Sequence, residues 1–318
     1  MQKLNKNDGD KIMTIAQALK FAAAKLNSAK ISLPDLEAEI LLSGILKKPR
    51  EFLLVHGEKR LSKKPAVKYQ LLLNRRLKGE PIAYLIGHKE FYGLDFMVNK
   101  NVLIPRPETE LMVEKALKLI TPISQPTTLI DVGTGSGCII VSLAKRLNQK
   151  SEIIGHKFIG TDISKSALNV ARKNSKLHGL DKSIKFIHGN LLKPILNSST
   201  SQADSKLVIL ANLPYGWLAW KNNCSLDAAG LKFEPSLALF TGENGLDLYK
   251  KLFRQIKNLT AKLSAACYVL CEFDPRQTAK IKRLAKQKLP EAKCQIKKDL
   301  SGLNRLLIIT VNCTNNKF

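Results

Sequence analysis

A glycine-rich loop is the first feature of this sequence that could bind a ligand. Residues 131–138 read Asp-Val-Gly-Thr-Gly-Ser-Gly-Cys, between a predicted strand and a predicted helix. Glycine permits positive φ and lets the backbone approach a ligand without a Cβ in the way. A dinucleotide fingerprint would have its third glycine one residue later, where Cys138 stands. The ordinary alternative is a tight strand-to-helix turn. The loop residues that we expect to contact a cofactor are Gly133, Thr134, Gly135, Ser136 and Gly137.

A carboxylate ends the next predicted strand. Asp162 closes the predicted strand 157–162, where an acid can accept hydrogen bonds from both hydroxyls of a ribose. Its ordinary role would be to cap the helix predicted from Ser166, and Ser164 competes for that role. The loop, the strand and the acid together favour a nucleoside cofactor. Gly-x-Gly-x-Gly with an aspartate after the next strand resembles the S-adenosylmethionine (SAM) methyltransferases.

A second candidate site follows the fourth predicted strand, as Asn212-Leu213-Pro214-Tyr215. Ligands of open α/β sheets bind beyond the carboxyl ends of the strands, where this turn is expected. The turn resembles the (Asn/Asp)-Pro-Pro-Tyr motif of methyltransferases that modify an amide or an exocyclic amino nitrogen. The lone pair of such a nitrogen is delocalised, and two acceptors aimed at its N–H groups would favour the pyramidal geometry that frees it. The side-chain oxygen of Asn212 and the carbonyl of Leu213 would be these acceptors, and Tyr215 would pack on the flat face of the target.

Position 213 departs from that motif, because leucine stands where amide-modifying enzymes have proline. The expected acceptor is a backbone carbonyl, which any residue supplies, and Pro214 keeps the preceding residue extended. Asn212 is expected to contact the cofactor as well. Asn-Leu-Pro-Tyr also occurs in ribosomal-RNA adenine dimethyltransferases, so these four residues leave the substrate open. The plain alternative is a proline turn that closes a strand.

The elements that must position these residues fall into three segments. Up to residue 81, apolar residues recur at helical spacing, which predicts a small helical bundle. From 82 to 103, aromatic and β-branched residues around Gly93 predict a β-hairpin linker. From 104 to 318, strands alternate with helices, which predicts an α/β fold with a mostly parallel sheet covered by helices on both faces. The predicted strands are 129–132, 157–162, 184–188, 207–211, 266–273 and 306–311, and the predicted helices are 138–147, 166–178, 245–262 and 275–288.

Composition excludes several classes of protein. With 44% hydrophobic residues, the chain has enough apolar material for a globular core. No apolar run is long enough for a membrane span, the polar start lacks a secretory signal, and the six cysteines form no CxxC pair. We therefore expect a cytoplasmic protein without a metal. Lys and Arg total 52 against 26 acidic residues, a net charge of +26 that either attracts RNA or belongs to a lysine-rich solvated surface.

Segments outside the two loops carry a more specific resemblance. Residues 79–93 and the run Val-Leu-Ile-Pro-Arg-Pro-Glu-Thr-Glu-Leu at 102–111 resemble the release-factor glutamine methyltransferase family, as do residues 233–239 and 298–306. The resemblance covers nearly the whole chain, and the Ile-Pro-Arg-Pro-Glu-Thr-Glu run is not part of the RNA dimethyltransferase pattern. The resemblance to the release-factor glutamine methyltransferases implies a SAM-methyltransferase fold. It also implies the transfer of a methyl group from SAM to the side-chain nitrogen of a glutamine in the Gly-Gly-Gln tip of a peptide-chain release factor.

The resemblance also suggests substrate-binding residues. Arg106, between two prolines, would line the cofactor or substrate mouth, or it would pair with Glu108 or Glu110. Phe233 and Glu234 would wall the glutamine channel, with simple packing as the alternative.

The third predicted strand ends in a departure from the family. Gly-Asn-Leu-Leu at 189–192 stands where an acid and an aromatic residue are usual. Asn190 would still hydrogen-bond the adenine, and Leu191 would supply an apolar contact. Trp217 and Trp220 would contact the partner or lie in the core.

The expected reaction is an in-line displacement that needs alignment rather than a strong base. The helical leader would grip a second surface of the release factor. Two alternatives stay open: an N6-adenine methyltransferase that acts on RNA, and a non-catalytic basic RNA-binding module with a purely structural glycine loop.

Overall fold

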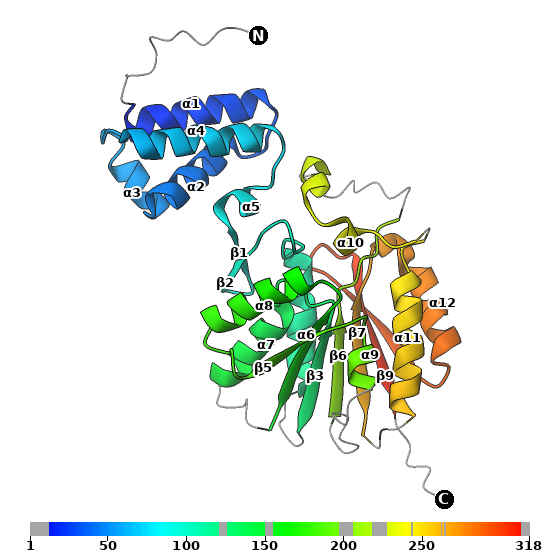
Figure 1. Cartoon of the computed structure of the whole chain (residues 1–318). Coiled ribbons are helices and arrows are strands. Elements are labelled where there is room, and N and C mark those ends of the chain that lie inside the picture. Colours follow the sequence, from blue (N-terminus) through cyan, green and yellow to red (C-terminus); the bar gives the residue numbers. More distant parts are fainter. Residues whose placement is uncertain are drawn as a thin grey trace, which may run out of the picture. The chain divides into compact units, whose positions relative to one another are not determined.

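The computed structural model describes residues 13–120, 126–149, 155–196, 206–217, 228–242, 244–261, 263 and 265–312. The described residues form two compact units, one of residues 13–87 and 228–233 and one of residues 88–217 and 234–312 (Figure 1). Of the residues singled out in the sequence, Trp220 lies outside the described residues.

The first unit is helical, as the sequence predicts. Its helices are α1 (Ile15–Ser28), α2 (Pro34–Leu46), α3 (Arg50–Val55), α4 (Lys63–Leu77) and α5 (Ile82–Ile86), and Ala228–Phe233 forms a 3-10 turn. Thr14 and Gln17 cap α1 reciprocally, and Pro34 starts α2 with its fixed φ. The apolar faces of the first four helices enclose one core that includes Leu26, Leu41 and Leu73. Helix α5 occupies the residues where we expected the linker to begin.

The predicted hairpin is present at the start of the second unit. Strands β1 (His88–Phe91) and β2 (Leu94–Met97) pair antiparallel. Tyr92 and Gly93 turn the chain with φ of 54° and 74°, the positive values that a tight hairpin turn needs. Phe91 and Phe96 are buried in the same cluster as the helices of this unit, so the hairpin packs with the sheet domain.

The second unit is built on a sheet in the order β5-β4-β3-β6-β7-β9-β8 (Figure 1). Strands β3 to β7 are parallel to one another, β9 pairs antiparallel with β7, and β8 pairs antiparallel with β9. The predicted mostly parallel sheet is therefore confirmed. The strands are β3 (Thr127–Val132), β4 (Lys157–Asp162), β5 (Ile184–His188), β6 (Lys206–Ala211), β7 (Cys267–Glu272), β8 (Lys293–Lys298) and β9 (Asn304–Val311).

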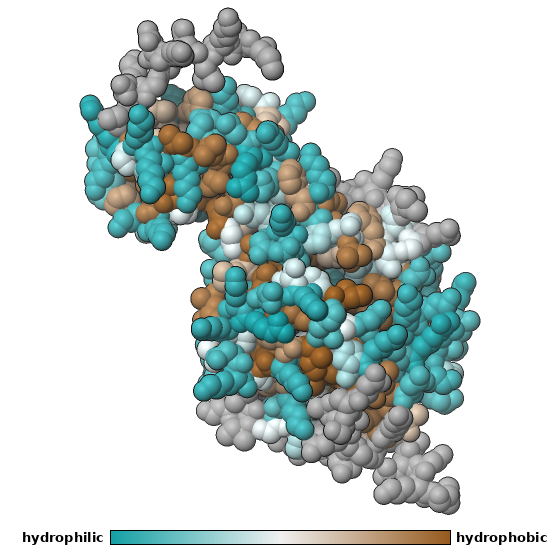
Figure 2. Space-filling view, viewed as in Figure 1, coloured by the Kyte–Doolittle hydropathy of each residue, from teal (hydrophilic) through white to brown (hydrophobic). Residues whose placement is uncertain are grey.

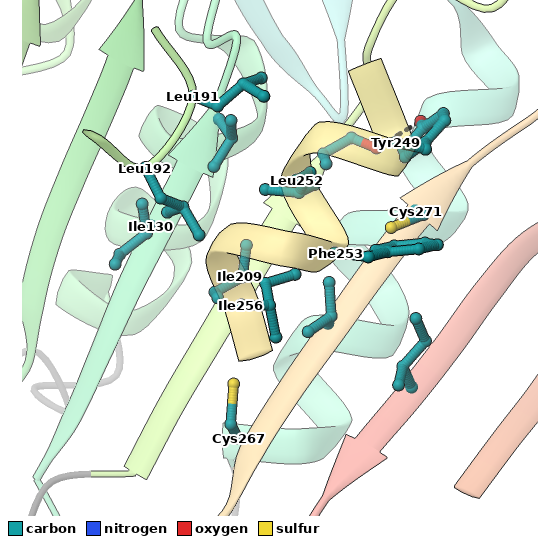
Figure 3. Packing of buried hydrophobic residues seen from close by; sticks show 14 of the residues in the cluster. Ile130, Leu191, Leu192, Ile209, Tyr249, Leu252, Phe253, Ile256, Cys267 and Cys271 are labelled. Carbon is teal, nitrogen blue, oxygen red and sulfur yellow. Dashed lines mark hydrogen bonds between the residues drawn. The ribbon is translucent and has the colours of Figure 1, made fainter. Parts of the chain in front are cut away.

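Helices cover both faces of this sheet (Figure 1). Side chains alternate between the faces, so Ile130 and Val132 join one apolar cluster and Leu129 joins the other. Helix α11 lies across the first cluster, with Leu252, Phe253 and Ile256 directed toward the strands (Figure 3). One face carries α6 (Glu110–Ile120), α7 (Cys138–Gln149) and α8 (Lys165–Leu177), and the other carries α9 (Lys193–Leu196), α11 (Asp247–Thr260) and α12 (Thr278–Lys288).

Strand β8 is not predicted by the sequence pattern. It is an edge strand of sequence Lys-Cys-Gln-Ile-Lys-Lys. Its partly buried positions are Cys294, Ile296 and Lys297, so its apolar pattern is weak. The helix expected over 275–288 is split into a 3-10 turn at Pro275–Gln277 and α12. Within the described part of the chain, no helix is both long and apolar enough to cross a membrane.

Candidate functional site

Two loops meet where the strand order of the sheet reverses. The glycine loop follows β3 and the Asn-Leu-Pro-Tyr turn follows β6, and these strands are neighbours that pair in parallel through Val132 and Ala211. Ligands of open α/β sheets bind at such a switch point. A Cβ placed on Gly133 would lie 3.0 Å from Cδ2 of Leu213, so the two loops are in direct contact.

The glycine loop is shaped by its backbone. Gly133, Gly135 and Gly137 have φ of 73°, 55° and 82°, values that L side chains rarely adopt. A Cβ on Gly137 would lie 3.2 Å from Ala171 of α8, so this glycine allows two helices to pack closely. A Cβ on Gly135 would meet nothing nearer than the Gly133 carbonyl at 3.9 Å. The loop is therefore open to a ligand at its centre.

Two buried side chains, those of Asp131 and Asn174, form hydrogen bonds with the loop. The hydroxyl of Thr134 donates a 2.6 Å hydrogen bond to Asp131, and Asn174 of α8 donates a 2.8 Å bond to the Ser136 carbonyl. Burial raises the pKa of Asp131 to about 7, although the Thr134 bond lowers it. Neither Asp131 nor Asn174 was predicted to have a role. The position of Asp131 directly before the loop was a usable signal, whereas nothing local marks Asn174.

Asp162 lies at the carboxyl end of β4 beside the loop. Its Oδ2 accepts from Gly135 N at 2.9 Å and its Oδ1 accepts from Ser164 N at 2.8 Å. The side chain of Ser164 caps α8, so the competing role of Asp162 as the helix cap falls to Ser164. Burial raises the pKa of Asp162, and the backbone donors lower it. Each carboxylate oxygen keeps further lone pairs that could accept a ligand hydroxyl.

The turn after β5 joins the same edge, since Gly189 N donates to the Asp162 carbonyl at 2.9 Å. Asn190 is exposed there and free to reach a ligand. Leu191 has a φ of 55° and a side chain that is only 7% exposed, in the apolar cluster with Leu192 and Ile130 (Figure 3). Little of the Leu191 side chain is therefore left for an adenine ring to cover.

The Asn-Leu-Pro-Tyr turn carries two candidate acceptors, the Asn212 Oδ1 and the Leu213 carbonyl, on successive residues. Nδ2 of Asn212 donates to the Thr109 hydroxyl at 3.0 Å, which leaves Oδ1 directed elsewhere. Among the hydrogen bonds of the described residues, none uses Asn212 Oδ1 or the Leu213 carbonyl. The Leu213 side chain is 3% exposed and packs in the apolar core. The leucine that stands in place of proline therefore contributes to core packing.

Tyr215 is directed toward a buried carboxylate. Its hydroxyl donates to Oε1 of Glu272 at 3.2 Å, and its carbonyl accepts from Gln277 Nε2 at 3.0 Å. Glu272 ends β7 and is 1% exposed. Burial raises its pKa to about 7, while Thr109, Arg305 and Tyr215 lower it. We expected Tyr215 to pack on the target, and the structure additionally ties its hydroxyl to Glu272.

A buried tyrosine supports the turn from inside the sheet. The hydroxyl of Tyr249 accepts from Leu213 N at 3.3 Å and lies against the carbonyls of Ala211, at 3.1 Å, and Glu272 (Figure 3). Burial raises its pKa well above the ordinary value, so the hydroxyl stays protonated. Tyr249 thus joins the carboxyl ends of β6 and β7, a role that the sequence analysis did not assign.

The Pro-Arg-Pro segment has a different partner from the expected ones. Arg106 pairs with Glu234, not with Glu108 or Glu110, and Glu234 also accepts from Ile104 N at 3.1 Å. Glu110 accepts instead from Tyr92 N at 2.9 Å. The Glu234 carboxylate therefore holds this segment in place. Phe233 belongs to the helical unit, and the ammonium group of Lys232 lies 5.3 Å from the centre of its ring.

Groups for nucleophilic or metal chemistry are not assembled here. Within the described residues, no cluster of three or more His, Cys, Asp or Glu side chains could hold a metal ion. Burial raises the pKa of the Cys138 thiol to about 12, so it is a poor nucleophile. The site offers hydrogen-bond acceptors and a backbone cradle, which are suited to binding and orientation.

Comparisons with known proteins match both units. A family model described as the PrmC N-terminal domain matches residues 17–87, and one described as a methyltransferase domain matches residues 123–304. The release factor glutamine methyltransferase of Buchnera aphidicola subsp. Baizongia pistaciae is 36% identical over 269 residues, which covers 85% of this chain and 89% of that protein. The corresponding protein of Staphylococcus aureus is 33% identical over 270 residues, covering 85% and 90%.

Longer relatives are also found. A bifunctional methyltransferase of Rickettsia prowazekii is 34% identical over 288 residues, covering 85% of this chain and 52% of that protein. The chain thus spans about half the length of the bifunctional methyltransferases that it matches. Among solved structures, the catalytic domain of hMettl16 in complex with MAT2A 3′UTR hairpin 1 has a TM-score of 0.53 at 16% identity, covering 86% of this chain and 92% of that one. At this identity the likeness concerns the fold alone.

Proposed function

We propose that this chain, which belongs to the release factor glutamine methyltransferase family, transfers a methyl group from SAM to the glutamine side-chain nitrogen in the Gly-Gly-Gln segment of peptide chain release factors. One observation carries the proposal: among the described residues, no hydrogen bond uses Asn212 Oδ1 or the Leu213 carbonyl, two acceptors on successive residues of the turn. A primary carboxamide carries two N–H donors on one nitrogen, so this pair of acceptors fits it.

The residues of the glycine loop fit SAM. Asp162 has lone pairs for the ribose hydroxyls, the loop is open at Gly135, and Asn190 is exposed for the adenine. When bound, SAM supplies an electrophilic methyl group on a sulfonium, which is a good leaving group.

The chain itself orients the amide. Asn212 and Leu213 hold the two N–H groups while the nitrogen forms its bond to the methyl carbon and the carbon–sulfur bond breaks. The surplus proton leaves to water, because an N-protonated amide is a strong acid, and no basic residue is required. Alignment of this kind is worth ~7–11 kcal/mol in favourable cases.

Transfer of a labelled methyl group tests the reaction. The full chain is incubated with labelled SAM and either a release factor, the same factor with its Gly-Gly-Gln glutamine replaced by alanine, or ribosomal RNA. We expect label in the unaltered release factor only. Label in RNA alone would instead favour an N6-adenine methyltransferase, and an absence of SAM binding would favour a non-catalytic RNA-binding module.

The helical unit is the proposed binding region for a second surface of the release factor. Leu54, Val55, Val67 and Leu71 are apolar side chains of α3 and α4 that are each more than half exposed. A second contact would raise the effective concentration of the substrate at the site. Val67→Lys with Leu71→Lys should raise KM for the release factor about tenfold and leave SAM affinity unchanged. Gln70→Lys on the same helix is the control, and an unchanged KM in the double variant would contradict this role.

The basic surface of the sheet domain supports an additional contact with RNA, such as that of the ribosome. Helices α11 and α12 pack together and carry exposed basic residues, and the side of the sheet domain that they cover is strongly hydrophilic (Figure 2). These residues are Lys250, Lys251, Arg254, Lys257, Lys280, Lys282, Arg283 and Lys286. Replacing four of them with glutamine should weaken RNA binding and reduce its salt dependence. If both quantities are unchanged, the charge only keeps the surface solvated.

A further inference from the structure

Helix α8 contacts two structures at once, the glycine loop and the hairpin of β1 and β2. Nδ2 of Asn174 donates to the Ser136 carbonyl of the loop at 2.8 Å. Just past the end of α8, Nε2 of His178 donates to the Asp95 carbonyl of β2 at 2.8 Å, and β2 lies beside the helix (Figure 1). Residues four apart lie on the same face of a helix, so one face of α8 serves both the loop and the hairpin.

The side-chain amide of Asn174 is bound at both of its ends. Oδ1 accepts from Met97 N at 2.8 Å, and Nδ2 donates to the Met97 carbonyl at 3.0 Å as well as to the Ser136 carbonyl. A backbone N–H only donates and a carbonyl only accepts, so the amide can take only this orientation. The Asn174 side chain is fully buried and Ser136 is 3% exposed, so these bonds are shielded from water.

On the hairpin, Asn174 occupies the place of a neighbouring strand. Within the described residues the hairpin sheet has two strands, so β1 pairs with one edge of β2 and no strand pairs with the other. The N–H and C=O of one strand residue point to the same side, and Asn174 binds both of these groups at Met97. Asn174 therefore satisfies the outer edge of β2 at the point where the hairpin ends.

On the glycine loop, Asn174 helps to fix one peptide unit. The carbonyl of the Ser136–Gly137 peptide accepts from Asn174, and its N–H donates to the Thr134 carbonyl at 2.7 Å. A chain without the Asn174 donor would leave the buried Ser136 carbonyl without this bond, at a cost that rotation of the peptide could relieve. The peptide directly follows Gly135, where the loop is open to a ligand, so its rotation would alter the cradle that receives SAM.

We propose that Asn174 is a positioning residue of the cofactor site, through which the packing of the hairpin against α8 and the binding of SAM stabilise each other. The same buried amide binds Met97 and Ser136, so a displacement at one of them changes the bonds available to the other. Such coupling is reciprocal, because a contact that strengthens SAM binding is itself strengthened by SAM to the same extent. The inference concerns the cofactor alone and holds whichever substrate receives the methyl group.

Calorimetry of SAM binding to the full chain tests the loop side. Asn174→Asp keeps the size of the side chain and an oxygen for Met97 N, but it places a carboxylate against two carbonyls. We expect SAM affinity to fall about tenfold to a hundredfold. Asn169→Asp, at an exposed asparagine of the same helix, adds the same charge and should change the affinity less than about twofold. An Asn174→Asp chain that folds and binds SAM as the wild type does overturns the proposal.

A backbone change in the hairpin tests the coupling from the other end. Met97→Pro removes the N–H that Asn174 accepts, at an edge where a strand tolerates proline, and should weaken SAM binding about threefold to tenfold. Met97→Ala is the control, because it changes only a side chain that is 42% exposed and keeps both backbone bonds. If Asn174 were merely structural, SAM affinity would not depend on the hairpin. A folded Met97→Pro chain with wild-type SAM affinity would therefore refute the coupling.

Hydrogen exchange of the wild-type chain tests the same coupling without a variant. Saturating SAM should slow exchange of the Met97 amide about tenfold more than exchange of the amides in β8. Strand β8 is separated from β3 by β6, β7 and β9, so its amides report only the general stabilisation that any ligand gives. Equal slowing at Met97 and in β8, or no slowing at Met97, overturns the proposal.

Discussion

The two loops of the site are built by different means. The glycine loop is held mainly by the neighbouring strand β4, since Gly133 N and Thr134 N both donate to the Thr161 carbonyl and Gly135 N donates to the Asp162 carboxylate, while Asn174 of α8 holds the Ser136 carbonyl. The Asn-Leu-Pro-Tyr turn is held by buried side chains from distant segments, namely Thr109, Tyr249, Glu272 and Gln277. The glycine loop thus offers backbone N–H groups and an open centre to a cofactor, whereas the buried side chains around the turn fix the direction of individual polar atoms.

The largest expected effect separates methyl transfer from cofactor binding. Asn212→Ala removes one acceptor of the target amide and should lower kcat on the order of 10²–10³-fold, as loss of one preorganised polar contact does in other enzymes. SAM affinity, measured by calorimetry, should change little, because Asp162 and the glycine loop remain intact. An Asn212→Ala enzyme with normal kcat would remove Asn212 from the reaction.

The reciprocal change acts on the other loop. Asp162→Ala removes the proposed acceptor of the ribose hydroxyls and should weaken SAM binding about tenfold to a hundredfold. At saturating SAM, kcat should fall much less than in Asn212→Ala. Equal losses of SAM affinity in the two variants would show that cofactor binding and substrate orientation are not separated between the two loops. Asp181→Ala, at an exposed aspartate, is the control.

The Tyr249 hydroxyl, which supports the turn from within the core, should contribute to the free energy of unfolding. Tyr249→Phe removes the hydroxyl that contacts Leu213, Ala211 and Glu272, and leaves buried backbone groups unpartnered. We expect the free energy of unfolding to fall by about 1–3 kcal/mol. Tyr268→Phe on β7 is the control, and urea denaturation measures both. An unchanged stability in Tyr249→Phe would mean that this hydroxyl does not support the turn.

The smallest effect is a change in the pH dependence of stability. The pKa of Glu272 is about 7 in the folded chain against an ordinary value of 4.5, so the folded state holds a proton that the unfolded state releases. The contribution of Glu272 to the free energy of unfolding therefore falls as the pH rises from about 4.5 to about 7. Glu272→Gln lacks this loss, so its stability relative to the wild type should increase by about 1–3 kcal/mol between pH 5 and pH 8. A constant difference across this range would contradict the raised pKa.

The same contrast explains what the sequence could predict. Positive φ at glycine and an acid after the next strand are local signals, so the glycine loop and its strands were found, as was the Asn-Leu-Pro-Tyr turn. Thr109, Tyr249 and Glu272 act through contacts between segments far apart in the chain, and neither their type nor their spacing marks them. The expected partners of Arg106 were wrong for this reason, because local acids were considered and Glu234 lies more than a hundred residues away. Strand β8 was missed because an edge strand needs little apolar pattern.

A structure of the full chain bound to a Gly-Gly-Gln peptide and S-adenosylhomocysteine tests the central claim most directly. The account predicts that the glutamine carboxamide nitrogen lies within hydrogen-bond distance of both Asn212 Oδ1 and the Leu213 carbonyl, with its lone pair toward the sulfur. A carboxamide held by other groups, or Asn212 turned with its NH₂ toward the peptide, would contradict the account.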